Sequence, residues 1–119
     1  MLRNLTSLYL YSIQIEELPK DVFSSLKSLA WIRLDGNNLK VIHGDSFGIL
    51  PNLTEVYLYN NQIDAIHEKF IDNTGVWRLD MRNNICVSII ETSASREPMR
   101  SRLQKCFENY KILGSGENF

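Results

Sequence analysis

The sequence predicts an α/β solenoid, in which short repeats stack to share one core and a helical cap closes the C-terminal end. Apolar residues recur with periods of 24, 24 and then 23 residues, and periods of about 20 to 50 residues are typical of stacked repeats. After the last repeat, apolar residues follow helical spacing. We expect repeats over 1–86, with units starting near 5, 29, 53 and 76, a cap over 87–113 with a helix near 98–110, and a flexible tail over 114–119.

The apolar residues that open each repeat have the spacing of a short β-strand. The equivalent triplets are Leu5, Leu8 and Leu10; Leu29, Ile32 and Leu34; Leu53, Val56 and Leu58; and Val76, Leu79 and Met81. Because successive side chains of a strand point to opposite faces, the last two residues of each triplet point inward and their neighbours point outward. Units this short bury their apolar faces only by stacking, which predicts one continuous core.

Further landmarks follow each triplet in the same register. They are Asn37, Asn61 and Asn84; then Leu39, Ile63 and Cys86; and, within the earlier units, Phe23, Phe47 and Phe70. The pattern matches L-x-x-L-x-L-x-x-N-x-L, so residues 2–86 resemble leucine-rich-repeat proteins of the extracellular "typical" type. The resemblance implies a right-handed superhelix with a concave parallel sheet, an asparagine ladder at the turns and a phenylalanine spine. Unit one departs from the pattern, with Ile13 in place of asparagine.

The outward strand positions form the candidate binding surface, since a fold does not by itself imply a function. Three columns are predicted: Ser7, Trp31, Glu55 and Arg78; Tyr9, Arg33, Tyr57 and Asp80; and Tyr11, Asp35, Tyr59 and Arg82. Aromatic residues and arginine are enriched among binding hot spots, which favours recognition of a protein ligand. Alternating charge, as with Arg33 beside Tyr57 and Asp80, is expected to add specificity. The alternative is that these side chains only stabilise the sheet surface as cross-strand pairs.

The two cysteines are interpreted as a cap disulfide. Cys86 ends the repeats and Cys106 lies about twenty residues further on, an even pair that is compatible with a bridge. The alternative is two buried thiols in a reducing compartment. Many extracellular repeat proteins end in paired cysteines, which favours the bridge, and the abbreviated ending resembles that of insect immune-type leucine-rich-repeat proteins.

The expected cap helix carries one apolar face and one basic face. Pro98 suits the first turn of a helix. The apolar face is formed by Met99, Leu103, Cys106, Phe107 and Tyr110. The opposite side carries Arg96, Arg100, Arg102 and Lys105, which we interpret as a solvated face, with contact to an acidic partner as the alternative.

Two sequons precede equivalent strands and are candidate glycosylation sites. Asn4-Leu5-Thr6 and Asn52-Leu53-Thr54 both satisfy N-x-[ST]. Asparagine is also frequent at this position of the repeat for structural reasons, so the motif alone is weak. Together with the cysteines, the sequons favour a secreted or extracellular protein over the alternative, a cytoplasmic scaffold or regulatory subunit with reduced cysteines.

Other functional classes have little support in the sequence. No catalytic or phosphate-binding motif occurs, so no enzyme activity and no cofactor are expected. His43 and His67 occupy equivalent positions, but two histidines without a clustered carboxylate or thiolate are too few for a good metal site. The net charge of −1 argues against nucleic-acid binding, and no apolar run approaches the ~20 residues needed for membrane insertion. The chain opens inside the first repeat, which predicts preceding repeats or a homodimer partner over this end.

Overall fold

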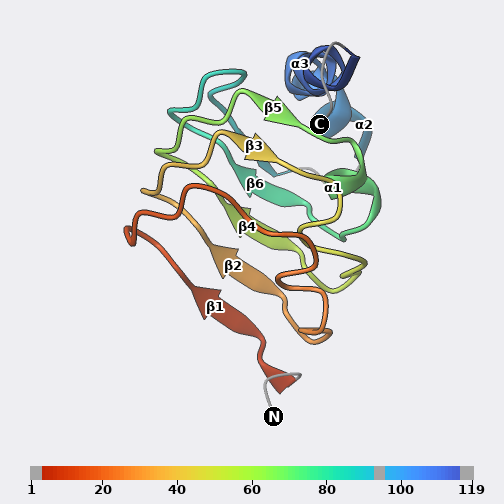
Figure 1. The fold of residues 1–119 in the computed structure, drawn as a ribbon. Coiled ribbons are helices and arrows are strands. Elements are labelled where there is room, and N and C mark those ends of the chain that lie inside the picture. Colours follow the sequence, from red (N-terminus) through yellow and green to blue (C-terminus); the bar gives the residue numbers. More distant parts are fainter. Residues whose placement is uncertain (1–3, 93–95, 116–119) are drawn as a thin grey trace.

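The computed structural model describes residues 4–92 and 96–115. Four short strands lie side by side in chain order and run parallel: β1 (Ser7–Tyr9), β2 (Trp31–Arg33), β4 (Glu55–Tyr57) and β6 (Arg78–Asp80). A fifth strand, β7 (Ile90–Thr92), pairs antiparallel with β6. A second parallel sheet, of β3 (Val41–Ile42) and β5 (Ala65–Ile66), lies on the return path of the chain, and helix α1 (Lys69–Asp72) follows it. Figure 1 shows these turns stacked from β1 towards the C-terminal helices.

The register of the large sheet follows the sequence repeat. Leu8 pairs with Ile32, Ile32 with Val56, and Val56 with Leu79. Ile32, Val56 and Leu79 are fully buried, whereas Leu8 in the first turn is only partly buried. One repeat length therefore brings equivalent residues of neighbouring turns into contact. Burial of each aliphatic side chain stabilises the folded state by about 1.5 to 3 kcal/mol.

The expected phenylalanine spine is present. The ring centroids of Phe23 and Phe47 are 5.4 Å apart, and those of Phe47 and Phe70 are 5.2 Å apart. The rings are tilted by 39° and 44°, an arrangement that aromatic pairs favour over face-to-face stacking. All three side chains are buried, so the spine joins three successive turns.

The asparagine ladder satisfies backbone groups at the turn after each strand. The Asn61 amide nitrogen donates to the carbonyl oxygens of Leu34 and Leu58, 3.0 Å away in each case, and its oxygen accepts from the Leu39 N–H at 3.0 Å. Asn37 and Asn84 bond in the same way to their own and the preceding turn. Each asparagine thus replaces water as the partner of backbone groups inside the stack.

The first turn folds without its own asparagine. Asn37 of the next turn accepts hydrogen bonds from the backbone N–H groups of Ile13 and Ile15, at 3.1 and 3.0 Å, and the Ile13 side chain is exposed. Ser12 has a φ of 55°, like its equivalents Gly36, Asn60 and Asn83 in the later turns, whereas Gln14 has a φ of 64° that its equivalents do not share. The backbone of the first turn therefore differs from the others at Gln14, while Asn37 still satisfies it.

The C-terminal cap contains two helices where one was expected. One residue, Leu103, separates helix α2 (Arg96–Arg102) from helix α3 (Gln104–Ser115). Four residues of the expected apolar face, Met99, Leu103, Cys106 and Phe107, are buried, and the fifth, Tyr110, is half-buried. Gly114 and Ser115, which we assigned to the tail, belong to α3, and residues 116–119 lie outside the described residues. Figure 1 shows α3 beside β5, at the end of the stack away from β1.

The basic side of the cap is not a purely solvated face, which corrects the sequence interpretation. Arg100 of α2 forms an ion pair with Asp72 at the end of α1. The Arg102 Nε atom lies 2.8 Å from Oε2 of Glu91 on β7, although this oxygen accepts no well-aligned hydrogen bond from the described residues. Lys105 is exposed, as expected, and the side chain of Arg96 lies outside the described part of the structure. Arg100 therefore links α2 to the repeats, and Arg102 links it to β7.

A disulfide joins the cap to the last repeat. Cys86 and Cys106 are bonded, with their Cα atoms 5.1 Å apart. Cys106 is fully buried in α3, and Cys86 packs against the edge of the same core. A bridge across a loop of this length stabilises the fold by about 3 kcal/mol in the chain-entropy model.

Candidate recognition surface

The outward columns lie in the predicted register. Trp31 pairs with Glu55 and Glu55 with Arg78, while Arg33 pairs with Tyr57 and Tyr57 with Asp80. Ser7 and Tyr9 of β1 continue the two columns. The third column lies just beyond the strand ends, where Tyr11, Asp35, Tyr59 and Arg82 follow β1, β2, β4 and β6.

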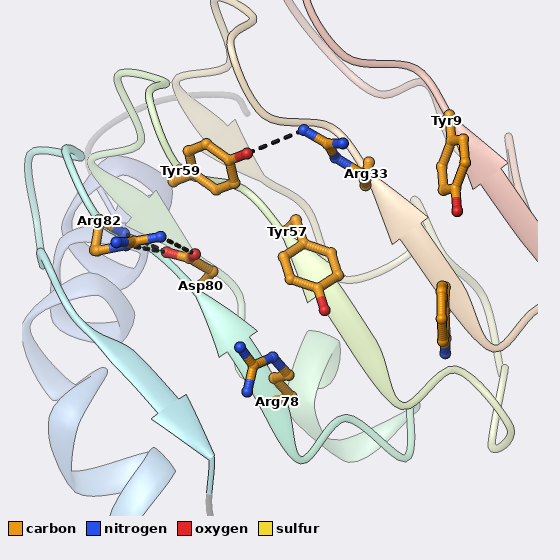
Figure 2. Close-up of a pocket in the computed structure, with 8 residues that line it drawn as sticks. Tyr9, Arg33, Tyr57, Tyr59, Arg78, Asp80 and Arg82 are labelled. Atoms are coloured by element: carbon orange, nitrogen blue, oxygen red, sulfur yellow. Dashed lines mark hydrogen bonds and ion pairs between the residues drawn. The ribbon is translucent and has the colours of Figure 1, made fainter.

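Eight of these side chains surround an open hollow of about 360 Å³ on the face of the sheet. They are Tyr9, Trp31, Arg33, Tyr57, Tyr59, Arg78, Asp80 and Arg82, shown in Figure 2. Four other candidate positions do not line it: Ser7, Tyr11, Asp35 and Glu55. Seven of the eight residues are arginine or aromatic, and four successive turns contribute to the hollow.

Arg33 is fixed by contacts within its own turn and with both neighbours. Its Nε and Nη2 atoms donate to Asp35 at 3.0 and 2.8 Å, and Nη2 also donates to the Tyr59 hydroxyl at 3.0 Å. On the other side, its guanidinium carbon lies 4.3 Å from the centroid of the Tyr11 ring, a cation–π distance. These contacts hold the guanidinium in one orientation.

Arg82 repeats the arrangement one unit beyond Tyr59. Its Nε and Nη2 atoms donate to Asp80 at 3.0 and 2.8 Å, and its guanidinium carbon lies 5.6 Å from the Tyr59 ring centroid. We call the six linked residues the arginine network: Tyr11, Arg33, Asp35, Tyr59, Asp80 and Arg82. Arg33, Tyr57 and Asp80 follow one another across the sheet as expected, but each arginine forms its ion pair with the aspartate two residues away in its own turn.

The electrostatics of the network favour its charged form. Burial raises the pKa of Asp35, but hydrogen bonds from Arg33, the backbone and Tyr59 outweigh it, so the pKa lies below its usual value. The hydrogen bond to Asp35 raises the pKa of Arg33, and that to Asp80 raises the pKa of Arg82. Both aspartates are buried, whereas the arginine side chains are 34% and 56% exposed. The network therefore presents mainly its positive groups to solvent.

A different arrangement occupies the other end of the hollow. The Tyr57 hydroxyl donates to Oε1 of Glu55 at 2.7 Å, and Arg78 lies on the hydroxyl side of the same ring (Figure 2). Burial and the bond to Glu55 raise the pKa of Tyr57, while Arg78 acts in the opposite direction. Tyr9 and Trp31 also line the hollow; they are 56% and 43% exposed, and their side chains make no hydrogen bond with the described residues.

The comparisons with known proteins agree with this geometry. A model of the Leucine rich repeat family matches residues 3–63 and 29–85, which together cover well over half of the chain. This chain belongs to the leucine-rich-repeat family. Its parallel strands and stacked turns are those of the solenoid-like α/β fold that the family implies.

Two relatives of this leucine-rich-repeat chain are prolargins. Prolargin from Mus musculus is 34% identical over 59 residues and prolargin from Bos taurus is 36% identical over 59 residues. Each match covers 50% of this chain and 16% of the prolargin, so the chain spans a small part of the length of these relatives. No solved structure matches the chain significantly.

The two histidines of the leucine-rich repeats contact a cap residue that sequence reasoning placed only on an apolar face. The Tyr110 hydroxyl lies 2.8 Å from Nδ1 of His43, and its ring centroid is 4.8 Å from that of His67. His67 Nδ1 accepts from the Lys69 backbone N–H at 3.0 Å. Within residues 4–92 and 96–115, no group of three or more metal-ligating side chains occurs. Helical spacing identified Tyr110 as part of the apolar face of the cap, but it did not reveal the contact of Tyr110 with distant turns.

The remaining candidates lie outside the hollow. Asn4 and Asn52 are both exposed, and Asn52 contacts the Lys27 carbonyl oxygen at 3.4 Å. In the part of the chain that the structure describes, no helix is long and apolar enough to cross a membrane.

Proposed function

We propose that this leucine-rich-repeat chain is a non-catalytic recognition module that binds a protein ligand through the concave face of a right-handed superhelix. The observation that supports this proposal is the open hollow, which is lined by three tyrosines, one tryptophan, three arginines and one aspartate. These types dominate binding hot spots because they combine large contact area with polar tips. Pairing within the sheet accounts for the arginine network, but it leaves the exposed Tyr9 and Trp31 side chains without a structural role.

An extracellular receptor-like or innate-immune setting is part of the proposal. The Cys86–Cys106 disulfide supports it, because such bonds persist in oxidising compartments and are rare in the cytosol. The competing function is an intracellular scaffold that uses the same face with both cysteines reduced. The redox state of these two cysteines in the native protein distinguishes the two settings.

The proposal is tested by comparing the proteins captured by the wild-type chain and by a triple alanine variant of Trp31, Tyr57 and Tyr59. Quantitative mass spectrometry of pull-downs from conditioned medium and cell extract should identify ligands that only the wild type retains. The matched control is Trp77→Ala, because Trp77 is 42% exposed, close to the 43% of Trp31, and does not line the hollow. Equal capture of every ligand by the wild type and the triple variant would contradict binding at this face.

A further inference from the structure

We propose that the hollow selects an extended acidic segment of its protein ligand, with a carboxylate bound by Arg78 and an apolar side chain held by Trp31 and Tyr9. The inference rests on the proposed function and adds the chemistry and spacing of the segment. It follows from the unequal state of the three arginines that line the hollow.

Arg33 and Arg82 already hold a carboxylate each. Asp35 and Asp80 occupy the Nε and Nη2 donors of these arginines, so their geometry is fixed and their charge is largely balanced. Arg78 differs, since no carboxylate among residues 4–92 and 96–115 lies within 4.0 Å of its guanidinium. Arg78 is therefore the cation of the hollow that is available to an acidic ligand.

The neighbours of Arg78 in the sheet form no ion pair with it. Glu55, its neighbour in the same column, accepts the Tyr57 hydroxyl at 2.7 Å. On the other side, Arg78 pairs with the uncharged Thr92 of β7. A ligand carboxylate can meet Arg78 with two parallel hydrogen bonds, a geometry that the planar guanidinium favours.

The sheet also sets the spacing of the two ligand groups. Trp31, Glu55 and Arg78 occupy one column on β2, β4 and β6. Adjacent strands lie ~4.8 Å apart, so Trp31 and Arg78 are about 10 Å apart along the column. A segment in the extended polyproline II conformation has three residues per turn and advances about 3.1 Å per residue, so residues three positions apart lie on the same face, about 9 Å apart. The predicted motif is an apolar residue and an aspartate or glutamate with two residues between them.

A displayed library of random, cysteine-free 12-residue peptides provides the probe. Peptides selected on the wild-type chain, with its disulfide intact, should be enriched in the predicted motif. Arg78→Gln should weaken binding of the consensus peptide about tenfold to hundredfold, as expected for a charge-assisted hydrogen bond. The control Lys20→Gln removes one exposed positive charge away from the hollow and should leave the affinity within about twofold.

A double-mutant cycle separates direct contact from general charge attraction. Changing the peptide's acid to its amide should weaken binding to the wild type by the same factor as Arg78→Gln, and should have little further effect on that variant. Binders that need Trp31 but show no acidic preference and no loss with Arg78→Gln would overturn this inference and leave the proposed function standing. A selection that yields only Trp31-independent binders, or no binders, would contradict both.

Discussion

The Nη2 atom of Arg33 lies 2.8 Å from Oδ2 of Asp35, a carboxylate that is almost completely buried beneath the surface of the sheet. Replacing Asp35 with asparagine should lower the free energy of unfolding by about 1 to 2 kcal/mol, because a charge-assisted hydrogen bond is lost while Arg33 stays partly solvated. Urea denaturation measures the change. The control Glu17→Gln, at an exposed carboxylate without an ion pair in the described residues, should change stability by less than about 0.5 kcal/mol.

The ion pair of Arg33 and Asp35 also predicts that the free energy of unfolding depends on pH. Because the pKa of Asp35 is lowered in the folded state, the unfolded chain takes up this proton first as the pH falls. The contribution of Asp35 is therefore fully present above its unfolded pKa of about 3.9 and is lost as the pH falls through the lower folded pKa. The difference in stability between wild type and Asp35→Asn should be constant near neutral pH and shrink in acid. A difference that grows in acid would contradict the sign of this shift.

Asn61 should be among the most sensitive polar residues of the stack. Asn61→Ala leaves the Leu39 N–H and the carbonyl oxygens of Leu34 and Leu58 without their buried partner, so we expect a loss of about 3 kcal/mol. The control is Asn38→Ala, because Asn38 is an exposed asparagine of the preceding turn. Thermal and chemical unfolding of the two variants gives the comparison, and equal losses would argue against a ladder that stabilises the turns.

The disulfide should stabilise the cap more than any single ion pair there. A variant with both Cys86 and Cys106 changed to alanine should lose about 2 to 4 kcal/mol of unfolding free energy. Arg100→Ala should lose less than about 1 kcal/mol, since its pair with Asp72 is partly exposed to solvent. Denaturation under oxidising and reducing conditions checks the order. A wild type that is unaffected by reduction would show that the bridge does not hold the cap.

Asn4 and Asn52 should carry glycans when the chain is made in a eukaryotic secretion host, because both asparagines are exposed. Intact mass before and after glycosidase treatment should show two occupied sites, and Asn52→Gln should remove one. The same mass measurement with and without reduction counts the free thiols. An unglycosylated product with two free thiols would favour the intracellular setting.

The sequence predicted those features that depend on the repeat alone. One repeat length sets the strand register, so the columns, the phenylalanine spine and the asparagine ladder follow from the positions of Leu8, Phe47 and Asn61 and their equivalents. The strand register also identified the residues around the hollow, because side chains alternate between the faces of a strand.

Features that depend on contacts between distant segments were not predicted. Nothing periodic marks Ile90–Thr92 as a strand, and it forms because β6 offers an open edge for antiparallel pairing. The two arginines of α2 bind acids on α1 and β7, which one helix face cannot reveal. Similarly, charge alternation suggested pairs across strands, whereas the arginines reach the aspartates of their own turn.

Isothermal titration calorimetry with one captured ligand tests most directly whether the chain recognises that ligand through the hollow. The measurement compares the wild-type chain with Trp31→Ala and Trp77→Ala. The two tryptophans are almost equally exposed, but only Trp31 lines the hollow. Recognition through the concave face predicts that Trp31→Ala raises the Kd at least about thirtyfold, as expected for a hot-spot residue, while Trp77→Ala leaves it nearly unchanged. An unchanged Kd for Trp31→Ala, or an equal loss for Trp77→Ala, would contradict it.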